Sequence, residues 1–312
     1  MLVEYVSCKY SRLRWQSSNV NENIFIAGTW DNGPNNKLEV WSAHDAMSDS
    51  ELDQLDRHGS TPFVGDVTQL CPFYNSMLAV SSSTGSLSVY TIKTVELDCN
   101  HSWQSLHDGS CNDVVYHSDT KELIACGDDG NITLIKLDDT SAAPVKIKVS
   151  ETSVQCLDVL SRQQVVCGNS AGHLKLFDMR RRECAMSMPG SLSSVLCVKR
   201  NPGNAHIVSS GNEIGELCVW DLRKTSSLVQ MAAHSGAFTD LSYDETMANI
   251  LYSSSNDGRL IRWNIEPNST CSSADCIAGK ERKDLPISSF NISRSNKLIF
   301  ASDNETIIYG QL

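Results

Sequence analysis

A hairpin outline recurs seven times along this chain at nearly constant spacing. Its clearest copy lies in residues 204–223, where two short β-rich runs flank a turn that ends at Gly215, and the second run closes on Trp220-Asp221. In each copy an aromatic or large apolar residue follows the last turn residue by five positions, at Trp41, Tyr90, Ile135, Phe177, Trp220, Trp263 and Tyr309. These residues are 42 to 49 positions apart. Such a period is typical of a β-propeller, in which each repeat is one four-stranded blade.

The last turn residue supports the same interpretation. It is glycine in five copies, at Gly85, Gly130, Gly172, Gly215 and Gly258. Glycine adopts the positive φ that many tight turns require. Asn36 and Asn304 take this position in the other two copies, and asparagine also tolerates positive φ. The sequence therefore predicts an all-β, seven-bladed β-propeller that spans residues 1–312 as a single domain, with Ile135 marking its weakest repeat.

The seventh repeat lacks a segment for an outer strand, because the chain stops at Leu312, soon after Tyr309. An unpaired strand edge promotes aggregation. Residues 2–10 form a β-rich run that precedes the first repeat and has no other assignment. We therefore expect residues 2–10 to pair as the outer strand of the last blade and to close the ring.

Two segments between repeats show no strand pattern. Residues 45–56 are acidic, and they predict a solvated loop at a blade edge, with an acidic docking segment as the alternative. Residues 264–285 contain Pro267, a Ser/Thr cluster and a mixed-charge run at 280–284, and their composition predicts a loop.

Composition limits the classes of partner. The formal net charge of -11 argues against a general nucleic-acid or anionic-membrane binder. No apolar stretch is long enough to cross a bilayer, and charges interrupt the N-terminal region, which therefore predicts no signal peptide. The 12 cysteines are scattered, mostly within apolar strands, as expected for free thiols of an intracellular protein.

The sixth repeat carries a complete set of polar residues: His234 before its first strand, Ser253 to Ser255 ending the second, Asp257 in the turn and Trp263 closing the third. A hydrolase triad could use His, Ser and Asp. A buried hydrogen-bonded network that holds the blade together accounts for the same residues and for the tryptophan as well. We therefore predict structural roles for His234, Asp257, Trp263, Trp220 and Trp41.

No pattern in the sequence points to catalysis or to a cofactor. There is no G-x-S-x-G turn, and the turn glycines form neither a P-loop nor a G-x-G-x-x-G set. The eight histidines are dispersed, and Cys271 and Cys276 are an isolated pair. We expect a protein that is not an enzyme and that has no metal site and no cofactor.

Basic residues gather in the turns of the fourth and fifth repeats. In a propeller blade, the turn between the first two strands and the turn between the last two lie on the same face. This places several cations together, with Arg162 and Lys199 beside Arg180, Arg181, Arg182, Arg200, Arg223 and Lys224. The group predicts either a docking patch for an acidic partner, since arginine pairs well with carboxylates, or an ordinary solvated rim.

Particular motifs in these repeats resemble those of WD-repeat propellers and, among them, the WD-repeat nucleoporins. The resemblance rests on the Gly-Thr-Trp-Asp-Asn turn at 28–32 with Leu-Glu-Val-Trp at 38–41, and on the motifs at 82–85, 127–132, 172–178 and 219–223. It covers nearly the full length of the chain.

This resemblance implies a non-enzymatic scaffold subunit of the Y-shaped outer-ring complex of the nuclear pore. The subunit would be a monomer within a hetero-oligomer, docked on an α-solenoid nucleoporin of the short arm and without direct nucleic-acid contact or membrane insertion. It would support pore assembly and transport of protein and mRNA at the nuclear envelope, and a role at kinetochores in mitosis stays open.

A second class remains open. Substrate receptors of cullin-RING ubiquitin ligases carry a Trp-Asp-x-Arg motif, and this chain has it at 220–223, with a near match at 177–180. Co-purification would separate the two classes, because one predicts nucleoporins and the other predicts the cullin adaptor.

Overall fold

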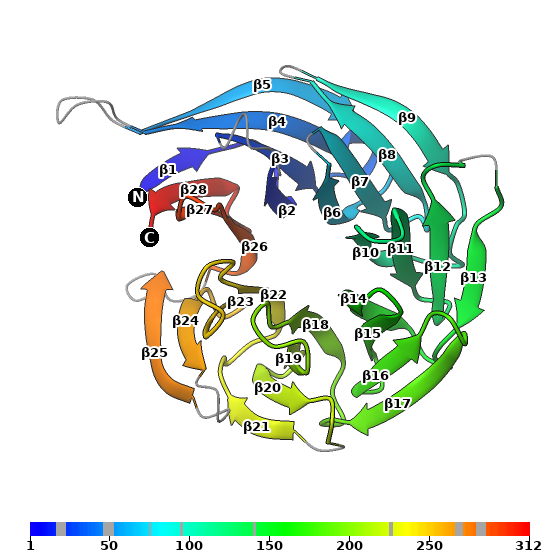
Figure 1. Ribbon diagram of the computed structural model, residues 1–312. Coiled ribbons are helices and arrows are strands. Elements are labelled where there is room, and N and C mark those ends of the chain that lie inside the picture. The colour runs from blue at the N-terminus through cyan, green and yellow to red at the C-terminus, as the bar shows by residue number, and fades with distance from the viewer. Residues whose placement is uncertain are drawn as a thin grey trace. The chain divides into compact units, whose positions relative to one another are not determined.

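The computed structural model describes residues 1–16, 23–45, 53–74, 76–93, 96–139, 142–224, 227–265, 271–278 and 285–312, without the side chains of 271–273. Within these residues the strands form seven antiparallel sheets of four strands each (Figure 1). These are the blades of a seven-bladed β-propeller, and the all-β fold class predicted from the sequence is confirmed.

The strands follow one another through the blades in chain order. Blade one contains β2 (Tyr10–Trp15), β3 (Ile24–Thr29), β4 (Lys37–His44) and β5 (Gln54–Pro62), with the short 3-10 helix η1 (Gly33–Asn35) before β4. Blade two contains β6 (Val67–Phe73), β7 (Met77–Ser82), β8 (Leu87–Ile92) and β9 (Leu97–Trp103). Blade three contains β10 (Cys111–His117), β11 (Glu122–Gly127), β12 (Asn131–Lys136) and β13 (Val145–Lys148). Blade four contains β14 (Val154–Ser161), β15 (Gln164–Asn169), β16 (His173–Asp178) and β17 (Glu183–Pro189).

The later blades repeat this order. Blade five contains β18 (Val195–Arg200), β19 (Ile207–Asn212), β20 (Glu216–Asp221) and β21 (Ser227–Ala232). Blade six contains β22 (Phe238–Tyr243), β23 (Ile250–Ser255), β24 (Leu260–Ile265) and β25 (Cys271–Ala278). Blade seven contains β26 (Ile287–Ile292), β27 (Lys297–Ser302) and β28 (Thr306–Gln311) from the end of the chain. Its fourth strand is β1 (Leu2–Tyr5) from the beginning.

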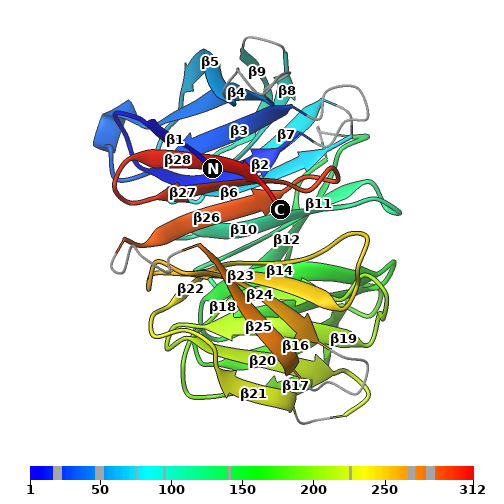
Figure 2. The same cartoon turned by 90° about the vertical axis from the view of Figure 1, so that its left-hand side faces the viewer.

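The N-terminal strand completes the last blade, as predicted. Leu2 pairs with Tyr309 and Tyr5 with Thr306, in antiparallel register, so both chain ends lie in one sheet (Figure 2). The predicted range of 2–10 is too long, however. The strand ends at Tyr5, and Tyr10 already pairs with Thr29 in blade one, because the chain turns between the two sheets at residues 6–9.

The five turn glycines have positive φ, between 70° and 85°. The expectation for the two asparagines is wrong. Asn36 is extended, with φ of -61°, because the longer first turn takes its positive φ at Asp31 and Gly33 and then passes through η1. In blade seven the positive φ falls on Glu305, one residue after Asn304.

Both segments expected to be loops contribute an outer strand. Part of the acidic run lies outside the described residues, but Gln54 begins β5, which pairs along β4 as far as Pro62. In the second segment, residues 271–278 form β25 against β24, while residues 266–270 and 279–284 lie outside the described residues. An outer strand contacts only one neighbour, so its side chains need little apolar character, and composition alone does not mark it.

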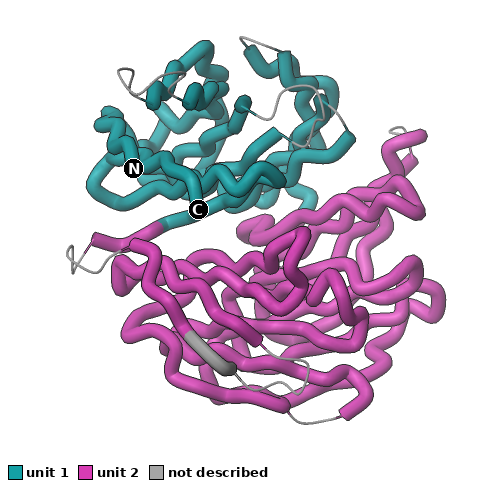
Figure 3. Tube along the Cα trace, turned by 60° about the vertical axis from the view of Figure 1, so that its left-hand side comes forward, with its two compact units in different colours: residues 1–106, 288–312 teal, residues 107–287 magenta. Residues whose placement is uncertain are grey.

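The chain divides into two compact units, residues 1–106 with 288–312, and residues 107–287 (Figure 3). In the first unit, aromatic side chains form much of the core, with Trp15 packed edge-on to Phe25 at 5.4 Å and Phe25 stacked on Trp41 at 6.2 Å. In the second unit, aliphatic and aromatic residues fill the spaces between successive blades. Burial of these apolar faces is the main force that holds neighbouring sheets together.

Candidate partner-binding surface

The polar residues of blade six form a continuous hydrogen-bonded chain. The Trp263 indole donates to Ser253 Oγ at 2.8 Å, and Ser253 Oγ lies 2.8 Å from His234 Nε2. His234 Nδ1 lies 3.0 Å from the Asp257 carboxylate, so this nitrogen carries the proton and Nε2 accepts from the serine. Burial is the largest influence on His234 and lowers its pKa, which keeps the imidazole neutral. A neutral, fully paired histidine inside a blade fits a structural role.

Two other blades build shorter versions of this network. In blade five the Trp220 indole donates to Ser210 Oγ at 2.8 Å. In blade one the Trp41 indole donates to the carboxylate of Glu39 at 3.1 Å, and the Tyr10 hydroxyl donates to the same oxygen. Glu39 is fully buried and is also paired with Lys37 at 2.7 Å. Sequence reasoning missed Glu39, although an acidic residue within an apolar strand is an available signal.

Blade three keeps only half of the network. His107 Nδ1 lies 2.9 Å from Asp129, but its buried Nε2 has no hydrogen-bond partner in the structure. The strand register explains this, because Ala125 takes the position of Ser253 and Ile135 that of Trp263. Burial raises the pKa of Asp129, but the hydrogen bonds from His107 and Asn131 outweigh it and lower the value to about 2.

The basic residues predicted at blades four and five divide into two groups. In the first group, the cations form ion pairs or hydrogen bonds with neighbouring groups of the same chain. Arg223 forms a bidentate pair with Asp221 at 2.7 and 2.8 Å and holds the pKa of that carboxyl down to about 2. Arg181 pairs with Glu183 at 3.2 Å, and the Arg200 guanidinium donates to the Leu160 carbonyl at 3.0 Å.

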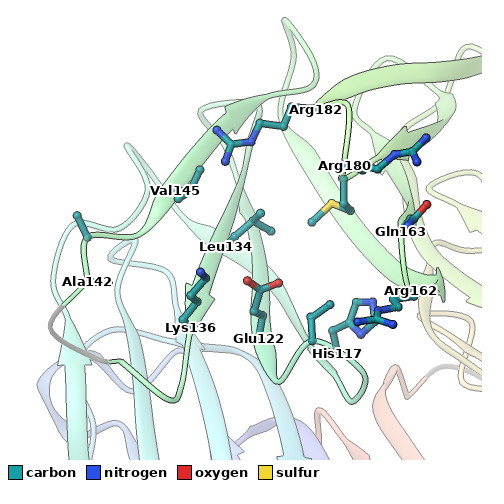
Figure 4. A pocket seen from close by; sticks show the side chains of 13 residues that line it. His117, Glu122, Leu134, Lys136, Ala142, Val145, Arg162, Gln163, Arg180 and Arg182 are labelled. Carbon is teal, nitrogen blue, oxygen red and sulfur yellow. The ribbon is translucent and has the colours of Figure 1, made fainter.

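The second group lines a pocket of about 390 Å³ between blades three and four (Figure 4). Arg162 lies in the turn after β14, and Arg180 and Arg182 lie in the turn after β16. Lys136, at the end of β12, faces them from blade three (Figure 4). Of the remaining predicted residues, Lys224 lies in the turn after β20 and Lys199 lies in β18, and neither lines this pocket.

Side-chain hydrogen bonds fix the two walls of the pocket relative to each other. Asp113 on β10 accepts from the Leu157 backbone N–H on β14 at 2.9 Å, and His117 Nε2 donates to the Ser161 carbonyl at 3.2 Å. Asp158 on β14 accepts from the Arg200 N–H at 2.7 Å and so links blade four to blade five. The predicted basic turns thus belong to a connected group of sheets within one compact unit.

Comparison with known families and proteins gives two kinds of match. Residues 98–136 match the family model described as "WD domain, G-beta repeat". The matched region contains the repeat that ends near Ile135, in which the closing tryptophan is absent. Nucleoporin Nup43 of Mus musculus and of Homo sapiens are each 26% identical over 240 residues, which cover 66% of this chain.

These findings fit a WD-repeat nucleoporin. The matched region spans 60% of the length of each Nup43 relative. In the part of the chain that the structure describes, no helix has the length and hydropathy needed to cross a membrane. The same residues contain no group of three or more side chains arranged to hold a metal ion.

Proposed function

We propose that this protein is a non-enzymatic scaffold subunit of the nuclear pore complex, which docks on other nucleoporins of the Y-shaped outer-ring complex. The observation that carries the proposal is the similarity to Nup43, a nucleoporin, together with the seven-bladed fold. The fold suits such a role, because its turns offer exposed positions for partners while the strands supply a rigid frame. An α-solenoid nucleoporin of the short arm is the proposed docking partner.

The polar networks support a role that does not involve catalysis. The Ser253 hydroxyl is fully buried and engaged by both His234 and Trp263, so it is not presented to a substrate. The Arg223 guanidinium of the Trp-Asp-x-Arg motif is bound to Asp221 of the same motif. This pairing is compatible with a role in holding the turn after β20.

Affinity purification of the tagged full chain, followed by mass spectrometry, tests the proposal. We expect nucleoporins of the outer-ring complex among the recovered proteins. Recovery of a cullin adaptor without nucleoporins would contradict the proposal and favour the ubiquitin-ligase alternative.

We further propose that the basic turns of blades four and five take part in docking. The variant Arg181→Glu/Arg182→Glu/Lys224→Glu should retain its fold, because exposed substitutions usually change stability by about 0.5 kcal/mol or less. It should weaken binding to the purified partner mainly by slowing association, with a smaller effect at high salt. Lys146→Glu/Lys148→Glu/Arg259→Glu carries the same charge change on other exposed residues of the same unit. Equal affinities for the two variants would show that the basic turns are only a solvated rim.

A further inference from the structure

The pocket between blades three and four combines an apolar lining with a basic lining. Its apolar part comes from Leu134 and Val145 on blade three and Met179 on blade four. Its polar part includes four cations, Lys136, Arg162, Arg180 and Arg182. Glu122 is the one acidic residue among the described lining residues, so positive charge predominates. A volume of about 390 Å³ is within the range of sites that hold small ligands or single side chains.

The four cations are available to a ligand. None of them forms an ion pair within the described residues, whereas Arg181, on the same turn as Arg180 and Arg182, pairs with Glu183. The nearest acidic residue of the turn, Asp178, accepts hydrogen bonds from the backbone N–H groups of Arg180 and Arg181 at 2.9 and 3.0 Å. Asp178 therefore caps its own turn, and Figure 4 shows the Arg182 side chain extending toward Val145 on the opposite wall.

Two polar atoms in the pocket wall have no hydrogen-bond partner in the structure. They are Nδ1 of His117, a residue only 3% exposed, and Oγ1 of Thr120. Because His117 Nε2 donates to the Ser161 carbonyl, Nδ1 is left with an unused lone pair. A buried polar atom without a partner is energetically unfavourable, so these two atoms favour a ligand that brings hydrogen-bond donors, such as the backbone N–H groups of a peptide.

We propose that this pocket binds an acidic segment of a partner protein, by taking up one apolar side chain while flanking carboxylates pair with the arginines. Charge complementarity selects such a segment, because the pocket is locally basic on a chain whose net charge is -11. Arginine pairs with carboxylates through parallel hydrogen bonds. Burial of a leucine-sized side chain against the apolar lining is also favourable. The proposal rests on the proposed function only in that the protein is an adaptor; it holds whichever complex the adaptor joins.

A peptide-binding experiment tests the pocket directly. The probe is a fluorescently labelled, terminally capped peptide with a central leucine and two glutamates on each side, and binding to the full chain is measured by anisotropy at low and high salt. The pocket variant is Arg162→Gln/Arg182→Gly. Glycine suits residue 182, because its φ is 58°, so the variant removes the guanidinium without straining the backbone. The control variant, Lys148→Gln/Arg259→Gln, removes two charges from exposed positions of the same compact unit outside the pocket.

We expect the pocket variant to bind the peptide about tenfold or more weakly, and the control variant to bind within about twofold of the wild-type protein. A peptide with serine in place of the central leucine should also bind more weakly. The proposal is overturned if both variants lose affinity equally, if the serine peptide binds as well as the leucine peptide, or if inorganic phosphate alone displaces the peptide at matched ionic strength. Recovery of nucleoporins by the tagged chain is scored separately, so a failure of the pocket and a failure of the proposed function give different results.

Discussion

At the scale of single residues, stability depends on how completely each buried polar atom is paired. Blade six satisfies every member of its network, blade one substitutes a carboxylate for the serine, and blade three leaves His107 Nε2 without a partner. The blade structure therefore accommodates several different polar networks, provided that the tryptophan or the residue in its place fills the same apolar space.

Trp263→Ala should be the most costly substitution in blade six. Emptying a packed tryptophan site typically costs about 3–5 kcal/mol, and Ser253 also loses a donor. Trp30→Ala should cost less, because Trp30 lies in a turn and is only partly buried. Urea denaturation of both variants measures the difference. A larger loss of unfolding free energy for Trp30→Ala would show that the Trp30 indole in the turn contributes more to stability than the Trp263 indole in the blade.

Ala125→Ser should complete part of the network in blade three. The new hydroxyl takes the position of Ser253 and can donate to His107 Nε2, which should raise the unfolding free energy by about 0.5–1.5 kcal/mol. Ala27→Ser is the matched control, since Ala27 has the equivalent position in blade one, where no histidine is provided. That variant should be destabilised, because the Trp41 indole already donates to Glu39 and the new hydroxyl must enter a filled, fully buried site. If both substitutions destabilise the protein to the same extent, then His107 Nε2 is not available as an acceptor.

Acid should destabilise the protein through two buried histidines. Burial lowers the pKa values of His107 and His234 below their ordinary 6.5, so the unfolded chain binds more protons in this range. The unfolding free energy should therefore fall as the pH drops below 6.5 and keep falling until the folded-state pKa values are passed. Denaturation midpoints at pH 7.5, 6.5 and 5.5 measure this slope, and His107→Asn/His234→Asn should flatten it. Asp129 and Asp221, with pKa values of about 2, contribute only at lower pH.

At the scale of strands, the three inner strands of each blade were predictable and the outer strands were not. Inner strands such as β15 and β23 have both faces packed, so their central residues are apolar, aromatic or small. Outer strands such as β17 are largely exposed, and their sequences show no alternation of apolar and polar residues. This is why residues 54–56 and 271–278 read as loops, although each lies in a complete ladder with its neighbour.

Strand β1 was predictable for a different reason, because the seventh repeat was one strand short. Deletion of residues 1–5 should expose the edge of β28, lower the melting temperature by several degrees and promote self-association. Removal of Leu312, which lies beyond the end of β28, is the control. Light scattering measures the self-association, and thermal denaturation measures the change in melting temperature. A deletion variant that is as stable and as monomeric as its parent would mean that β1 adds little to the blade.

The candidate site was only partly predictable, because sequence spacing places turns on a face but does not show which cations are already paired. Arg223 and Arg180 both end a Trp-Asp-x-Arg-like motif, yet Asp221 binds the guanidinium of the first, whereas Asp178 binds backbone N–H groups of the second turn. Lys136 was not foreseen, since it belongs to blade three and meets the arginines only through the packing of two sheets.

At the scale of the whole molecule, the single-domain interpretation remains a prediction. The chain forms two compact units, and a blade cannot bury both of its faces without neighbours. We therefore expect both units to unfold in one transition. Differential scanning calorimetry measures this: a calorimetric enthalpy that matches the van't Hoff enthalpy supports one cooperative domain. Two resolved transitions would assign separate stabilities to residues 107–287 and to the remainder of the chain.

The pairing of β1 with β28 has a consequence for synthesis in the cell. Leu2 and Tyr309 are partners in one ladder, so β1 leaves the ribosome long before its partner strand β28 and must wait for it. At about 5–20 residues per second, that wait is roughly 15 to 60 seconds. During this time β1 has no partner strand, and its length of four residues limits the edge that it offers to other chains.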